Sequence, residues 1–122
     1  MAVIFDPNCI FCKIGRKELS ADILFENDAY VVFKDIQPKA PVHLLVATKN
    51  HISSIMEIQE KDKELIGGLI LLAKKIAQDQ GIAASGFKLV FNVGRGGGQV
   101  IDHLHLHLLG GWAVPAQKKV EV

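Results

Sequence analysis

The segment His103-Leu104-His105-Leu106-His107-Leu108-Leu109 constrains the fold more than any other part of the chain. Successive side chains of a β-strand point to opposite faces of its sheet, so this alternation predicts a strand with histidines on one face and leucines on the other. Burying the leucines gives no packing reason for three imidazoles on the opposite face, which favours a functional role. Three imidazoles can bind a metal ion, or they can transfer protons and attack an electrophile such as phosphorus.

The glycine-rich loop directly upstream, residues 94–98, favours phosphate as the ligand, because glycines allow backbone N–H groups to converge on an anion. It is not a P-loop, since no Gly-Lys-Ser/Thr follows, and it is not a dinucleotide fingerprint, since Gln99 takes the place of the last glycine. Alone, the pattern fits a flexible hairpin loop equally well. Arg95 could touch a phosphate there, although a mobile loop cation is the simpler interpretation, and strand alternation places Asp102 on the leucine face.

The rest of the chain predicts an α+β fold with a mainly antiparallel sheet. A short helix is expected over residues 9–15, and a turn at Asn27-Asp28 predicts a hairpin. Five segments have the pattern of strands: 23–26, 29–34, 42–47, 87–93 and 100–109.

Helical spacing of apolar residues predicts one long helix over residues 61–80, ended by Gly81. Ser54 and Glu57, three positions apart, have the spacing of a capping box near its start. Acidic side chains cluster near its start, where they suit the positive end of the helix dipole: Glu57, Glu60, Asp62 and Glu64.

Gly67 and Gly68 each cost this helix about 1 kcal/mol, so we expect another helix to pack closely at that point. Leu71 and Leu72 widen the apolar stripe beyond what one face needs. That excess favours a dimer interface.

The chain has 122 residues and a net charge of +1, which predicts a single domain over residues 1–122 and no electrostatic footprint for nucleic acid. Residues 1–5 are apolar but too short for a secretory signal, and no apolar run approaches the roughly 20 residues of a membrane span. We therefore expect a cytoplasmic protein. Cys9 and Cys12 form a C-x-x-C, which in a reducing compartment indicates a metal site, a redox pair or two free thiols.

The histidine strand resembles the signature of the histidine triad (HIT) family, His-φ-His-φ-His-φ-φ, where φ is apolar. The likeness extends over nearly the whole chain. Leu109-Gly110-Gly111 is similar to the Hint branch, the histidine triad nucleotide-binding proteins. The other matching motifs are Cys9–Ile14, Phe33–Ile36, Pro38–His43, Lys49–Ile52 and Asn92–Gln99.

This resemblance implies a homodimer of α+β protomers with a HIT-like fold: a five-stranded antiparallel sheet, one long helix and one or two short helices. It also implies hydrolysis of purine nucleoside phosphoramidates, such as adenosine 5'-phosphoramidate, to the nucleoside monophosphate through a covalent nucleotidyl-histidine. The alternatives are a dinucleoside polyphosphate hydrolase, a nucleotide-binding adaptor with weak catalysis, and a zinc protein without enzymatic activity.

Position by position, the resemblance makes His105 the nucleophile and His107 the residue that holds the phosphate oxygens, with His43 and His103 completing the catalytic cluster. Asp35 would bind the ribose hydroxyls, and the backbone N–H of Val100 would bind phosphate. Phe11, Ile14, Phe33 and Ile36 would surround the base, and Asn92, Gly98 and Gln99 would line the phosphate.

Some members of the family also imply a structural zinc ion bound by Cys9, Cys12, His51 and His103. No organic cofactor is implied. Two positions depart from the family pattern: Val100 replaces a frequent serine, which predicts slower chemistry, and Trp112 replaces a frequent basic residue.

Overall fold

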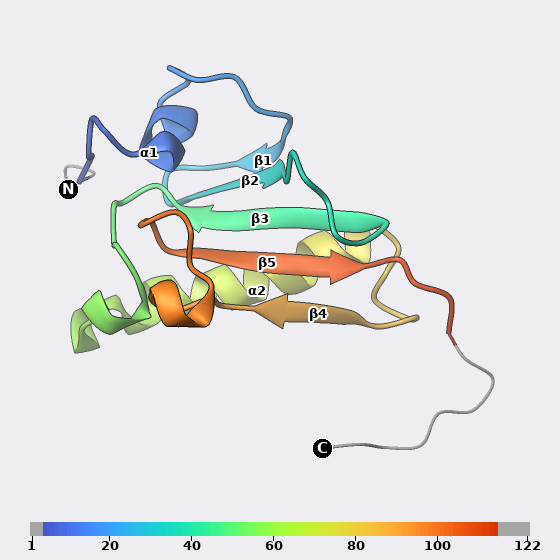
Figure 1. The fold of residues 1–122 in the computed structure, drawn as a ribbon. Helices are drawn as coiled ribbons and strands as arrows, with labels where there is room; N and C mark the ends of the chain where they lie inside the picture. Colours follow the sequence, from blue (N-terminus) through green and yellow to red (C-terminus); the bar gives the residue numbers. More distant parts are fainter. Residues whose placement is uncertain (1–3, 115–122) are drawn as a thin grey trace.

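A single antiparallel sheet organises the computed structural model, which describes residues 4–114 of the chain. Within those residues it has five strands in the order β1-β2-β3-β5-β4 (Figure 1). The α+β fold is thereby confirmed. The strands are β1 (Ile23–Glu26), β2 (Tyr30–Lys34), β3 (Val42–Thr48), β4 (Phe87–Val90) and β5 (His105–Gly110).

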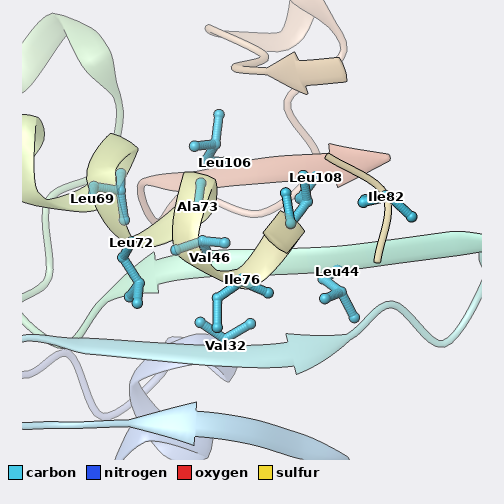
Figure 2. Close-up of a cluster of buried hydrophobic side chains, with 11 residues drawn as sticks. Val32, Leu44, Val46, Leu69, Leu72, Ala73, Ile76, Ile82, Leu106 and Leu108 are labelled. Carbon is cyan, nitrogen blue, oxygen red and sulfur yellow. The ribbon is translucent and has the colours of Figure 1, made fainter. Parts of the chain in front are cut away.

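The long helix α2 (Lys63–Asp79) covers one face of the sheet and forms the main core with it (Figure 2). Leu106 and Leu108 of β5 are 1% and 0% exposed and pack in this core. The leucine face of the histidine strand is therefore buried as the alternation predicts. The helix contributes Leu69, Leu72, Ala73, Ile76 and Ala77, and the other strands contribute Val32, Leu44 and Val46.

The opposite face of the sheet carries the short helix α1 (Ile10–Gly15) and a second buried cluster. Leu45 and Ala47 of β3 belong to this cluster, and they lie directly opposite His107 and His105 in the β3–β5 pairing. Directly paired residues project to the same face. The two imidazoles therefore share a face with α1, and that face is partly covered.

Two strands are shorter than the sequence pattern predicts. β5 begins at His105 instead of residue 100, because the chain turns at residues 101–103 and the N–H of Leu104 bonds to the carbonyl of Ile52 in a loop. β4 ends at Val90 instead of residue 93. Beyond it the glycine loop forms the 3-10 turn η3 (Arg95–Gly97), and glycine freedom at positive φ lets it do so.

The start of the long helix also differs from the prediction. Ser54 does act as a cap, but its hydroxyl accepts from the N–H of Met56 and begins a separate 3-10 turn, η1 (Ile55–Glu57). The capping box that precedes α2 is formed by Gln59 and Asp62, across the turn η2 (Glu60–Asp62). Extended backbone at Ile58 separates the two turns, so a cap at Ser54 cannot serve α2.

Gly68 of α2 has a packing reason for its place in the helix, but the contact comes from Tyr30 of β2 rather than from another helix. A Cβ at Gly68 would collide with the Tyr30 hydroxyl, which donates to the carbonyl of Leu65 at 2.6 Å. Leu72 is 9% exposed and belongs to the core, whereas Leu71 is 66% exposed. Only Leu71 of that pair extends the apolar stripe onto the surface.

The two adjacent glycines of α2 give a matched test of this packing. Gly68→Ala should lower the free energy of unfolding by about 1–2 kcal/mol, because the Tyr30 hydroxyl must move and lose its acceptor. Gly67→Ala meets nothing within 4 Å and should raise it by up to about 1 kcal/mol through helix propensity. Urea denaturation measures both variants, and equal effects would contradict the packing account.

Candidate active site and metal centre

The five histidines of the chain separate into two groups on the α1 side of the sheet. His43 on β3 and His105 and His107 on β5 form one group, in which the rings of His105 and His107 are 5.0 Å apart. His51 and His103 lie in loops beside Cys9 and Cys12. His103 precedes β5 and is 0% exposed. His103 still lies on the side that the alternation predicts, because the ring of Phe11 in α1 packs against the rings of both His103 and His105.

A chain of hydrogen bonds fixes the tautomer of His107. The backbone N–H of Lys39 donates to Nδ1 of His43 at 3.0 Å, so that nitrogen carries no proton. The proton of neutral His43 is then on Nε2, which lies 2.9 Å from Nδ1 of His107. A neutral imidazole has one donor and one acceptor nitrogen, so His107 accepts at Nδ1 and carries its own proton on Nε2.

His105 has the opposite tautomer. Its Nδ1 lies 2.6 Å from the carbonyl oxygen of His103, and a carbonyl can only accept, so Nδ1 carries the proton. The lone pair is consequently on Nε2. The ring of Phe11 meets the ring of His105 edge-on at 4.9 Å and restrains its orientation.

The electrostatic surroundings keep these imidazoles neutral at pH 7. Burial lowers the pKa of His105 below its usual value, and burial together with the neighbouring His105 and His43 lowers the pKa of His107 to about 4. Burial also lowers the pKa of His43, against the opposing effect of the Asp35 carboxylate 3.4 Å away. The group therefore presents one nitrogen lone pair, on His105, and one N–H donor, on His107.

The second group has the donor set of a zinc site. Nδ1 of His103 lies 3.2 Å from Sγ of Cys9 and 3.5 Å from Sγ of Cys12, and Nδ1 of His51 lies 3.4 Å from the same Cys12 sulfur. Nε2 of His103 is 2.6 Å from the carbonyl of Thr48 and must donate to it, so the Nδ1 lone pair faces the sulfurs. Two sulfurs and two imidazole nitrogens within 4.8 Å of one another could hold a metal ion.

Burial and the neighbouring Cys9 raise the pKa of the Cys12 thiol to about 11. A cation at the centre of the cluster is what would make these thiols thiolates. Asp35, His43 and His107 also bring ligand atoms within 4.8 Å of one another. That group offers only three ligands and no sulfur, whereas the cysteine cluster offers two sulfurs and two imidazoles, so the cysteine cluster is the candidate metal centre.

The residues expected around the base differ widely in exposure. Phe11, Ile14 and Phe33 are buried in the second core cluster, and the rings of Phe11 and Phe33 contact each other at 5.2 Å. Ile36 is 94% exposed. The side chain of Asp35 is 17% exposed and lies beside His43.

Gln99 braces the glycine loop. This residue is 4% exposed, and its side-chain amide forms hydrogen bonds only with backbone groups. Its amide nitrogen, Nε2, donates to the carbonyls of Ser53 and Ile101, and its Oε1 accepts from the N–H of Gly94. Asn92 likewise donates to the carbonyl of Gly97 at 2.8 Å. The Gln99 side chain is therefore a structural brace rather than a free phosphate ligand, whereas Val100 is 78% exposed.

Two further expectations for the loop are wrong. Arg95 is not a free cation, because it bonds to the carbonyl of Gln99 and to the carboxylate of Asp102. Asp102 is not on the leucine face, because strand β5 begins only after it. The sequence analysis also missed the backbone groups of Lys39 and Thr48, which set the histidine tautomers. No side-chain signal could have identified them, since any residue supplies a backbone N–H or carbonyl.

Comparisons with known proteins cover most of the chain. The family model described as "Scavenger mRNA decapping enzyme C-term binding" matches residues 8–120. Protein HitA of Neisseria gonorrhoeae is 44% identical over 103 residues, covering 84% of this chain and 95% of that protein. The purine nucleoside phosphoramidase of Escherichia coli (strain K12) is 40% identical over 102 residues, covering 84% of this chain and 86% of that protein.

The fold is similar to that of a HIT family hydrolase from Legionella pneumophila Philadelphia 1. The TM-score is 0.86 at 46% sequence identity, and the match covers 89% of this chain and 97% of that chain. Within residues 4–114, no helix has both the length and the apolar character that crossing a bilayer requires.

Gln99→Ala tests the brace. Removing the amide leaves up to three backbone groups without a partner, so the free energy of unfolding should fall by about 2 kcal/mol. Gln37→Ala, at an exposed position, is the matched control and should change it by less than about 0.5 kcal/mol. Urea denaturation gives both values, and a loss no larger than that of the control would contradict the structural role.

Proposed function

The chain belongs to the histidine triad (HIT) family of hydrolases, and from that premise we propose that it is a purine nucleoside phosphoramidate hydrolase of the Hint branch. The observation that carries the proposal is the pair of opposite tautomers on β5, a lone pair on His105 and an N–H donor on His107. Cleavage of a phosphorus–nitrogen bond needs both groups, a nucleophile for phosphorus and a donor for the oxygens and the leaving amine. The purine nucleoside phosphoramidase of E. coli, similar over most of its length, supports this substrate class.

In the proposed reaction, the Nε2 lone pair of His105 attacks the phosphorus of the substrate. A bond forms between Nε2 and phosphorus, the phosphorus–nitrogen bond breaks, and its electron pair leaves with the amine, which takes up a proton from solvent. Water then attacks phosphorus and loses a proton to solvent, the bond between Nε2 and phosphorus breaks, and the nucleoside monophosphate leaves while Nε2 of His105 recovers its lone pair. Neutral His105 at pH 7 suits this role, since protonation would remove the nucleophile.

His107 would serve the reaction through its Nε2–H, which can donate to a phosphate oxygen and stabilise the developing charge. His43 and the Lys39 N–H keep that proton in place, because they occupy Nδ1 of His107. Asp35 would accept hydrogen bonds from the ribose hydroxyls. The backbone N–H of Val100 would bind the phosphate, because those of Gly98 and Gln99 already donate to the carbonyls of Arg95 and Gly94. The Val100 side chain brings no hydroxyl to the leaving group.

We further propose that Cys9, Cys12, His51 and His103 hold a structural zinc ion. The set of two sulfurs and two imidazoles is complete without water, so the ion would be closed to substrate and would link α1 to the start of β5. Fixing His103 matters for catalysis, because its carbonyl oxygen holds the proton of His105. We also propose that the protein is a cytoplasmic homodimer. The exposed Ile70 and Leu71 of α2 are candidates for the dimer interface.

His105→Gln tests the covalent mechanism. The amide keeps a planar polar group but cannot attack phosphorus, so kcat/KM for adenosine 5'-phosphoramidate should fall at least about 1,000-fold. The Kd for AMP should stay within about tenfold, because phosphate contacts by the loop and His107 persist. Steady-state kinetics and calorimetry measure the two quantities. If the wild-type protein hydrolysed a diadenosine polyphosphate faster than the phosphoramidate, the result would favour the alternative hydrolase. A variant that retained more than a few per cent of wild-type kcat/KM would rule out His105 as the nucleophile.

Elemental analysis of protein purified without chelator tests the metal centre. We expect close to one zinc ion per chain, and less than about a tenth after Cys12→Ser, because a site with three ligands binds zinc far more weakly. His105→Gln is the matched control and should retain the zinc, since His105 is outside the ligand set. Zinc-free wild-type protein would contradict the site.

A further inference from the structure

Arg95 bridges the two limbs of the glycine loop. Its Nη1 donates to the carbonyl of Gln99 at 2.5 Å and to that of Val100 at 3.4 Å, while Nη2 is 2.9 Å from the carboxylate of Asp102. The planar guanidinium holds several acceptors in one fixed arrangement, which a lysine ammonium cannot do. The segment 99–102 is therefore held from outside by Arg95 and from inside by the buried Gln99 amide.

The contact with Gln99 fixes the direction of a neighbouring N–H group. The carbonyl of Gln99 and the N–H of Val100 belong to one planar peptide unit, so holding the oxygen orients the hydrogen. Donation to the carbonyl by a charged guanidinium also polarises the unit and makes its N–H a stronger donor. Among the residues that the structure describes, this N–H has no hydrogen-bond acceptor. The Val100 side chain has no polar atom, so the backbone is all that this position offers to a ligand.

We propose that Arg95 and Asp102 form a clip that holds the Gln99–Val100 peptide unit in the orientation that binds the nucleotide phosphate. This inference rests on the proposed function. Both side chains are positioning residues: Asp102 holds the guanidinium, and the guanidinium holds the peptide unit. Phosphate binding by this loop thus depends on two charged side chains that do not contact the nucleotide.

Arg95 and Asp102 are exposed, so we expect their ion pair to contribute little to global stability and its effect to be on the loop. The Arg95 and Asp102 side chains are 66% and 65% exposed, and ion pairs at such exposure contribute little to folding. The Gln99 brace stays in place without them. Removing the clip should therefore loosen the loop and leave the rest of the protein folded.

A direct contact between Arg95 and the phosphate is the competing explanation. The two explanations predict opposite results when Asp102 is removed. If Arg95 binds phosphate directly, releasing it from Asp102 should leave affinity unchanged or raise it. If the clip positions the peptide unit, removing either member should weaken binding.

The experiment compares Arg95→Ala, Arg95→Lys and Asp102→Ala with Lys75→Ala, which removes an ion pair of similar exposure on α2. AMP binding by calorimetry, steady-state kinetics with adenosine 5'-phosphoramidate, thermal unfolding and amide exchange at Val100 are measured for each. We expect each clip variant to raise the Kd for AMP and the KM by about 3- to 10-fold, with kcat within about twofold. Arg95→Lys should not restore affinity, the Tm should match that of Lys75→Ala, and exchange at Val100 should be faster than in wild type.

A Kd for AMP within twofold of wild type in both Arg95→Ala and Asp102→Ala would overturn the clip, and so would tighter binding by Asp102→Ala. A loss of affinity accompanied by a large drop in Tm would mean that Arg95 and Asp102 stabilise the fold as a whole, and it would overturn the clip as well. If wild-type protein binds no AMP, the proposed function fails and the clip's role fails with it. The wild-type titration thus distinguishes the two failures.

Discussion

The pairing of β3 with β5 is the constraint on which the rest of this structure depends. In its register Leu45 lies opposite His107 and Ala47 opposite His105, so the imidazoles share a face with α1 and the leucines of β5 enter the core under α2. A slip of one residue would reverse every side chain of β5, burying imidazoles against α2 and exposing Leu106 and Leu108. The hydrophobic core and the site therefore stabilise the same register, because only one alignment satisfies both.

The pairing also brings His43 to His107, and with it a mechanism for assigning protons. Imidazoles with identical chemistry acquire different roles because different backbone groups bind them. The Lys39 N–H acts through His43 to leave His107 a donor, whereas the His103 carbonyl makes His105 a lone-pair donor at Nε2. The Thr48 carbonyl does the same for His103, whose remaining nitrogen faces the cysteines. Burial keeps these rings neutral, so the assignment holds at pH 7.

The glycine loop needs a different kind of support, because five residues with four glycines have little side-chain packing of their own. Gln99 supplies it from the buried side and Arg95 from the exposed side. Glycine freedom allows the loop to turn, and these two side chains limit that freedom where an anion is expected to bind. A flexible sequence and an ordered loop are compatible for this reason.

The sequence by itself determined the α+β class, the leucine face of β5, the glycine loop and the cysteine–histidine ligand types, because two-residue and helical periodicities and short motifs are local properties. Tertiary structure alone decided that β5 begins at His105, which leaves His103 in the preceding loop, and that Tyr30, not another helix, packs on Gly68. It also decided which nitrogen of each histidine carries a proton. Those outcomes depend on contacts between residues far apart in the chain, often with backbone groups that every residue carries, and no local pattern records them.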